Sequence, residues 1–218
     1  MGRYVRVFEA LIAVAAWAAL ALQWHIVLTA AAGQGISPWA ALGNFLSYFT
    51  ILTNALIAFS LSLGLVAPRT ALSRFFALPS FQTAVAGCII SVSLIYHISL
   101  AKAWNPQGLQ WWTNFFLHDA IPVAYVLHWV LFVPKGQLHW GLPILWMAYP
   151  LAYLAWMMGH GALTGFYPYP FVNVAWEGYA SVLRHLLFLI AGWITGFYAL
   201  AIVDNYWGKH LDNFVAKK

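Results

Sequence analysis

The sequence contains very few charged residues, and this scarcity excludes most soluble architectures. Only 7% of the 218 residues are Asp, Glu, Lys or Arg, whereas 63% are hydrophobic. Soluble domains carry about 25% charged residues, so this chain has too few charges to cover a surface in water. Its apolar residues form long continuous runs rather than alternating patterns, which is typical of membrane helices and not of membrane barrels. We therefore expect an all-α, polytopic integral membrane protein.

Cysteine is almost absent as well. Cys88 is the only cysteine, so the chain can form no internal disulfide and has no CxxC pair or cysteine cluster for a metal. The signatures His-x-x-Glu-His, HExxH and CxxCH are also missing. We expect no cofactor and no bound metal. A haem or metal protein is the alternative, because histidines from different helices can ligate either group. The histidines available for it are His25, His97, His118 and His185.

Long apolar runs divide the chain into six segments, each near the ~20 residues that a membrane span requires. They cover residues 8–30, 38–66, 80–101, 114–133, 142–162 and 179–203. No linker or soluble domain interrupts them, so residues 1–218 are predicted to form a single six-helix transmembrane domain. The first segment has a longer apolar run than a typical signal peptide, and we expect it to remain as a span.

The positive charges favour one orientation of these spans. If the N-terminus is cytoplasmic, the inner side collects most of the Lys and Arg residues and the outer side keeps only Lys102, which is a strong positive-inside bias. The inner residues are Arg3, Arg6, Arg69, Arg74, Lys135, Lys209, Lys217 and Lys218. Both termini are thus predicted to be cytoplasmic. The net charge of +5 reflects this topology, and we expect no nucleic-acid partner.

With this orientation, most polar side chains of the spans lie in the outer half of the membrane. They are His25, Asn44, Ser47, Thr50, His97, His118, Asp119, His160, Arg184 and His185. Ionisable groups are costly in hydrocarbon, so a polar pocket that opens outward is the natural shelter for them. His128 lies too deep toward the inner side to belong to such a pocket.

Two spans carry a polar stripe. In the second, Asn44, Ser47, Thr50 and Asn54 fall within an arc of about 120° on a continuous helix. The alternative is that these residues only hold helices together, by bonding to the i−4 carbonyl or to a neighbouring helix.

In the fourth span, Asn114, His118, Pro122 and Tyr125 share a face, and Asp119 is displaced by about 100°. Pro122 cannot donate to the carbonyl of His118, so a kink or a trapped water is expected there. The alternative for His118 is an imidazole hydrogen-bonded in the core.

Arg184 needs a partner inside the membrane because arginine stays charged. We predict an ion pair with Asp119, with Glu177 as the alternative partner. Such a pair either fixes the helix register or lets Arg184 bind a carboxylate or an oxyanion.

The connection at residues 163–171 contains two prolines and several aromatic residues, so it cannot continue a helix. It suits a rigid lid at the interface, either as part of an aromatic belt or as a gate for an acyl chain. The substrate pocket is predicted to include His97, Tyr125, His185, Tyr169 and Phe171.

Three motifs in order suggest a family. They are SYFTILTN at residues 47–54, Asn114 and His118 followed by Pro122, and Thr164-Gly165 followed by Tyr169-Pro170-Phe171. Over nearly its full length the chain resembles the androgen-induced and androgen-dependent family of integral membrane hydrolases, especially its bacterial six-span branch. The resemblance implies a threonine hydrolase of the bacterial plasma membrane that cleaves fatty-acid esters of hydroxy fatty acids.

By motif position, the resemblance implies Thr50 as nucleophile and His118 as its base. The chain departs from the animal members because Thr53 and Asn54 stand near the position of their acidic residue. His160 is also out of register with their histidine pair. Asn114 or Asp119 is expected to orient the imidazole.

The oxyanion would be stabilised by Asn44, Asn54 or Arg184. The substrate partner is a lipid ester from the bilayer. A non-enzymatic lipid-binding or sensory membrane protein is the further alternative.

Overall fold

The computed structural model describes residues 2–102 and 104–215, with side chains described as far as His210. Helices form nearly all of these residues. Their bounds are α1 Arg3–Gly33, α2 Pro38–Leu46, α3 Phe49–Val66, α4 Ala71–Phe76, α5 Pro79–Ile95, η1 Tyr96–Leu100, α6 Leu109–Phe115, η2 Phe116–Ala120, α7 Ile121–Phe132, α8 Leu142–Trp146, α9 Ala148–Thr164, η3 Pro170–Val172 and α10 Val174–Val215.

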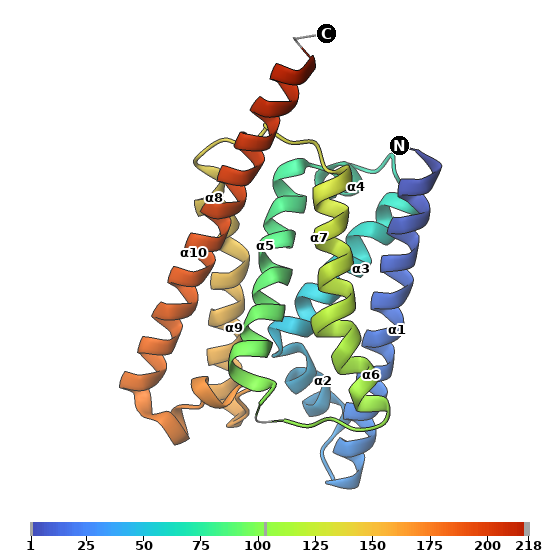
Figure 1. The fold of residues 1–218 in the computed structure, drawn as a ribbon. Coiled ribbons are helices and arrows are strands. Elements are labelled where there is room, and N and C mark those ends of the chain that lie inside the picture. The colour runs from blue at the N-terminus through green and yellow to red at the C-terminus, as the bar shows by residue number, and fades with distance from the viewer. Residues whose placement is uncertain (1, 103, 216–218) are drawn as a thin grey trace.

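Six helical stretches are long and apolar enough to span a membrane, which confirms the predicted all-α, six-span fold. The helices stand side by side as one bundle, and the two ends of the chain lie at the same end of it (Figure 1). Short connections link consecutive spans, so sequential neighbours run antiparallel. The protein is a multi-pass membrane protein.

The prediction that residues 38–66 form one continuous helix is wrong. The helix breaks at Ser47 and Tyr48, where Tyr48 has an extended backbone with ψ 124° and α3 begins anew at Phe49. Neither Gly nor Pro occupies the break, so local propensity does not explain it.

The backbone groups freed at this break find partners on other segments. The hydroxyl of Tyr153 donates to the carbonyl of Ser47 at 2.9 Å, and the indole of Trp156 donates to the carbonyl of Leu46 at 3.2 Å. The N–H of Phe49 donates to the hydroxyl of Tyr169 at 3.0 Å. Inside a bilayer, unpaired backbone groups are costly, so these tertiary contacts are what permit the break.

Several predicted boundaries also shift. The fourth span begins at Leu109 instead of residue 114 and consists of α6, η2 and α7. The third and fourth spans each contain a π-helical turn, η1 and η2 respectively. In η2, the N–H of Ile121 bonds to the carbonyl of Phe116, five residues back. Pro122 follows at once without an N–H, which favours such a bulge.

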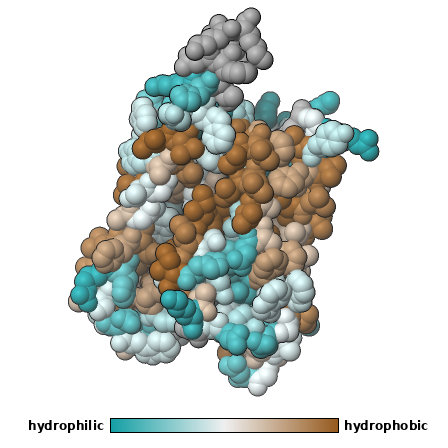
Figure 2. Space-filling model, in the orientation of Figure 1, coloured by the Kyte–Doolittle hydropathy of each residue, from teal (hydrophilic) through white to brown (hydrophobic). Residues whose placement is uncertain are grey.

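The outer surface matches a membrane protein. Figure 2 shows hydrophobic side chains across the middle of one face, hydrophilic side chains toward both ends, and a hydrophilic patch that interrupts the lower half. In the core, His128 of α7 and Glu9 of α1 form a fully buried pair, with 3.0 Å between Nε2 and Oε1. This pair links the first and fourth spans away from the candidate site.

Candidate functional site

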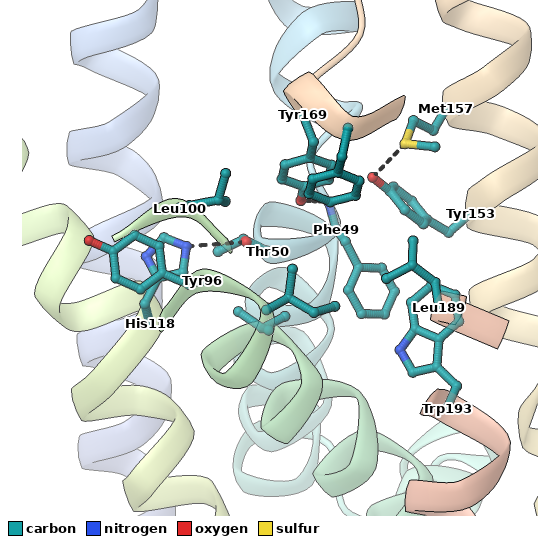
Figure 3. Close-up of a pocket in the computed structure, with 13 residues that line it drawn as sticks. Phe49, Thr50, Tyr96, Leu100, His118, Tyr153, Met157, Tyr169, Leu189 and Trp193 are labelled. Carbon is teal, nitrogen blue, oxygen red and sulfur yellow. Dashed lines mark hydrogen bonds between the residues drawn. The ribbon is translucent and has the colours of Figure 1, made fainter. Parts of the chain in front are cut away.

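Thr50 and His118 lie in direct contact. The hydroxyl oxygen of Thr50 is 3.3 Å from Nε2 of His118, and Figure 3 marks this interaction with a dashed line. Thr50 is the second residue of α3, and His118 belongs to the π-helical turn η2. Only 8% of Thr50 is exposed, so the contact is shielded from bulk solvent. The fold thus joins two residues that are 68 positions apart in the sequence.

The other ring nitrogen of His118 fixes the tautomer of the neutral imidazole. Nδ1 lies 3.0 Å from the carbonyl oxygen of Asn114, which can only accept a hydrogen bond. Nδ1 therefore carries the proton, and Nε2 presents its lone pair to the hydroxyl of Thr50. This is the arrangement that a general base requires.

Tyr96 holds the imidazole from its flat side. Its ring stacks on His118 with 4.1 Å between centroids and 25° between planes. The amide of Asn114 donates to the hydroxyl of Tyr96 at 2.7 Å, so Asn114 supports both the ring and the nitrogen of His118. The orientation of the base is consequently set by a carbonyl and an aromatic ring, rather than by a carboxylate.

Asp119 neither orients His118 nor pairs with Arg184, the two roles predicted for it. Its carboxylate pairs with Nε2 of His97 at 3.1 Å, and the two side chains are 35% and 50% exposed. The pair joins η1 to η2 on the outside of the bundle. The predicted Arg184–Asp119 pair is wrong, because Arg184 lies exposed on α10 and its guanidinium donates to Ser181 at 2.9 Å.

The break between α2 and α3 directs a helix N-terminus at the dyad. The first N–H groups of a helix have no partner within it, and Thr50 and Ile51 occupy the second and third positions of α3. Tyr169, from the segment that connects α9 to α10, lies across this end with its hydroxyl on the N–H of Phe49. Thr50 is a further neighbour of that hydroxyl. Burial raises the pKa of Tyr169, so the phenol keeps its proton at neutral pH and can donate it.

Two cavities meet at the dyad, and Thr50, His118, Tyr96, Leu100 and Tyr169 line both. The larger has a volume of about 450 Å³ and extends between α1, α2 and α6 under the connecting segment. The smaller, about 30 Å³, is an apolar recess among α5, α9 and α10, lined by side chains such as Met157 and Trp193 (Figure 3). The volume of the larger cavity falls within the range of small-molecule sites.

Of the other predicted site residues, Asn114, Tyr169 and Phe171 also line these cavities. Phe171 further accepts a hydrogen bond at its carbonyl from Nδ1 of His185 at 2.7 Å, so His185 holds the connecting segment in place. His185 itself borders a neighbouring surface recess with Phe171, not the cavities at the dyad.

Like Asp119, Arg184 and His185, five further predicted residues lie apart from the cavities at the dyad. His97 is bound to Asp119, and Tyr125 is buried in the core with only 1% of its surface exposed. Asn44 is separated from Thr50 by the helix break, and neither it nor Ser47 borders these cavities. The hydroxyl of Ser47 bonds to the carbonyl of Gly43 at 2.9 Å, which agrees with the alternative that it only holds the helix.

Asn54 is the fifth of these residues and is not an oxyanion donor. Its amide donates both hydrogens to carbonyls, to Thr50 at 2.8 Å and to Leu117 at 3.2 Å. Asn54 thereby ties α3 to η2 immediately behind the dyad. It positions Thr50 relative to His118 without facing the cavities.

Several residues that border the larger cavity or support the break were not predicted from the sequence, among them Tyr96, Tyr153, Gln23 and Gln110. Tyr96 precedes His97 directly and carries no distinguishing signal in the sequence, because a tyrosine near a membrane interface is commonplace. The two glutamines were detectable as uncharged polar residues within or beside apolar runs.

The histidines do not gather into a metal site. Within the part of the chain that the structure describes, no group of three or more His, Cys, Asp or Glu side chains comes together that could hold a metal ion. His97, His118 and His185 bond instead to Asp119, Asn114 and Phe171. The arrangement does not favour the haem or metal alternative.

Comparison with known proteins gives no match to a family model, a curated protein or a solved structure.

Proposed function

We propose that this protein is an intramembrane lipid ester hydrolase in which Thr50 is the nucleophile and His118 its general base. The observation that carries the proposal is the 3.3 Å contact between the Thr50 hydroxyl and Nε2 of His118, with Nδ1 committed to a backbone carbonyl. A threonine hydroxyl is a poor nucleophile unless such a base takes its proton. The larger cavity beside the contact offers space for a lipid ester.

In the first half of the reaction, His118 removes the proton of Thr50 while the hydroxyl oxygen attacks the ester carbonyl. The negative charge that develops on the carbonyl oxygen is stabilised by the N–H groups of Thr50 and Ile51 and by the phenol of Tyr169. His118 then gives its proton to the departing alkoxide, which leaves an acyl group on Thr50. In the second half, His118 activates a water that releases the fatty acid and restores the threonine.

The resemblance to the androgen-induced family points to the same two residues and to fatty-acid esters of hydroxy fatty acids as first substrates to assay. The apolar exterior lets such a lipid enter from the bilayer. The positive-inside pattern supports a dyad in the outer half of the membrane, and the resemblance supports a location in a bacterial plasma membrane.

The test is hydrolysis of these esters by the protein in lipid nanodiscs. Thr50→Ala and His118→Ala are each expected to lower kcat by at least about a hundredfold, the lower range for loss of acid–base catalysis. Thr53→Ala is the matched control, because Thr53 is buried one turn further along α3 and bonds to Tyr149 away from the cavities. Full activity in both dyad variants would refute the mechanism. Ester binding without turnover in the wild type would favour the lipid-binding alternative.

A further inference from the structure

One wall of the larger cavity carries a hydrogen-bonded group of uncharged side chains. The amide of Gln110 donates to Oε1 of Gln23 at 2.8 Å and to the hydroxyl of Thr113 at 3.1 Å. That hydroxyl in turn lies 2.7 Å from the same Oε1. These contacts hold the two glutamines in defined orientations on α1 and α6, and both border the cavity. We call Gln23, Gln110 and Asn114 the amide wall.

The contacts within the amide wall leave a mixed set of donors and acceptors. Nε2 of Gln110 already donates to Gln23 and Thr113, whereas its Oε1 has no partner among the described residues and is open to a ligand. In Gln23 the donor is open instead. Its Oε1 accepts two hydrogen bonds, while its Nε2 has no partner among the described residues. Asn114 also borders the cavity, but its Oδ1, which has no hydrogen-bond partner, is covered by surrounding atoms. A ligand hydroxyl can both donate and accept, and it matches such a wall.

Charge is missing from this cavity. Among the described residues that line it, none is Lys, Arg, Asp or Glu. A carboxylate on the substrate would find no cation here; only Nε2 of Gln23 could donate to it, while the open oxygen of Gln110 would repel it. Transfer of an unpaired carboxylate away from water is costly, so the wall selects against an ionised leaving group.

The wall also extends over a defined length. Asn114 lies one turn before His118 and Gln110 two turns before it, or about 6 Å and about 12 Å along the helix at 1.5 Å per residue. Aromatic rings of Tyr48, Tyr96 and Trp104 complete the cavity. A group with several hydroxyls that extends this far from the ester bond would meet the two glutamines.

We propose that the amide wall binds the alcohol half of the substrate and that this half is an uncharged polyol, as in acylglycerols or acyl sugars. The proposal rests on the hydrolase function, and it predicts a substrate preference that differs from esters of hydroxy fatty acids, whose leaving half carries a carboxylate. The acyl half then lies on the other side of the scissile bond, where the apolar recess of about 30 Å³ has room for only a small part of it.

Binding can be measured without hydrolysis by using ether lipids. In nanodiscs, tritiated 1-O-dodecylglycerol is displaced by unlabelled 1-O-dodecylglycerol, dodecyl glucoside, 1-dodecanol or dodecanoic acid. Both polyols are expected to bind about tenfold more tightly than dodecanol, since two or three net hydrogen bonds supply that difference. Tighter binding of the glycerol ether or of the glucoside tells acylglycerols from acyl sugars. Equal or tighter binding of dodecanol or dodecanoic acid by the wild type would overturn the proposal without any variant.

Variants test whether the glutamines of the amide wall cause the preference for polyols. Gln110→Leu and Gln23→Leu are each expected to reduce the preference for polyol over dodecanol to about twofold. Gln107→Leu is the matched control, because Gln107 is exposed, bonds to Asn105 and does not line the cavity. An unchanged preference in both wall variants, with the protein folded by size exclusion, would place polyol binding elsewhere.

The hydrolysis assay separates this proposal from the proposed function. If the wild type prefers the polyol ethers but hydrolyses no ester, the amide wall still binds polyols and the hydrolase function is refuted. If the wild type hydrolyses the hydroxy-acid ester faster than the glycerol ester of the same fatty acid, the hydrolase function stands and the polyol preference is refuted.

Discussion

The phenol of Tyr169 offers a stringent test of the catalytic geometry, through Tyr169→Phe. Its hydroxyl accepts the N–H of Phe49 at 3.0 Å, so its own proton points away from that amide, and Thr50 is among its neighbours. Loss of one oxyanion donor costs about 2.7–4 kcal/mol. The N–H groups of Thr50 and Ile51 still remain, so we expect the lower end, a fall in kcat of about a hundredfold.

The assay compares kcat and KM of wild type and Tyr169→Phe for one lipid ester in nanodiscs. KM should change little, because the oxyanion exists only in the transition state. Tyr149→Phe is the control, since it removes a buried phenol that bonds to Thr53 at 3.1 Å outside the cavities. A wild-type kcat in Tyr169→Phe, or a rise in KM alone, would refute the role of the phenol.

Three further changes probe the scaffold around the dyad. Asp119→Asn removes the carboxylate that contacts His97 between the two π-helical turns. Both side chains are partly exposed, so stability should fall by no more than about 1 kcal/mol in thermal unfolding, while kcat falls several-fold through misplacement of the base. Gly161→Ala should loosen the segment after α9, because a Cβ at this position would overlap the ring of Tyr167. The measurement is the rate of proteolysis, which should rise. Gly159→Ala is the control and should leave that rate unchanged, because a Cβ there meets open space. His128→Leu leaves its buried carboxylate partner unpaired and should lower stability by about 3–5 kcal/mol, and unchanged thermal stability would contradict that pairing.

Much of the scaffold was predictable because hydrophobicity alone determines it. Long apolar runs predict helices in a bilayer, and Ser37 with Pro38 begins α2 as a cap and first residue, with the Ser37 hydroxyl accepting the N–H of Ala40. The break after Ser47 was not predictable in this way. It depends on partners that Tyr153, Trp156 and Tyr169 supply from distant positions.

The candidate site was likewise predictable only in part. Thr50 and His118 stood out because polar groups are expensive in hydrocarbon and because the motifs resemble a known family. Of the two residues expected to orient the imidazole, Asn114 contacts His118 and Asp119 does not. Adjacent helical residues point about 100° apart, and the carboxylate of Asp119 contacts His97 instead. The carbonyl of Asn114 and the ring of Tyr96 orient the imidazole of His118.

The sequence by itself determined that this chain forms six apolar helices and that a few polar residues must find shelter among them, since lipid tolerates neither open backbone groups nor isolated charges. Only the tertiary structure decided which polar residues meet. The direction of a side chain depends on where a helix breaks or bulges, and in this protein both π-helical turns and the break before α3 lie at the site. Those irregularities are stabilised by contacts between distant spans, which no local pattern encodes.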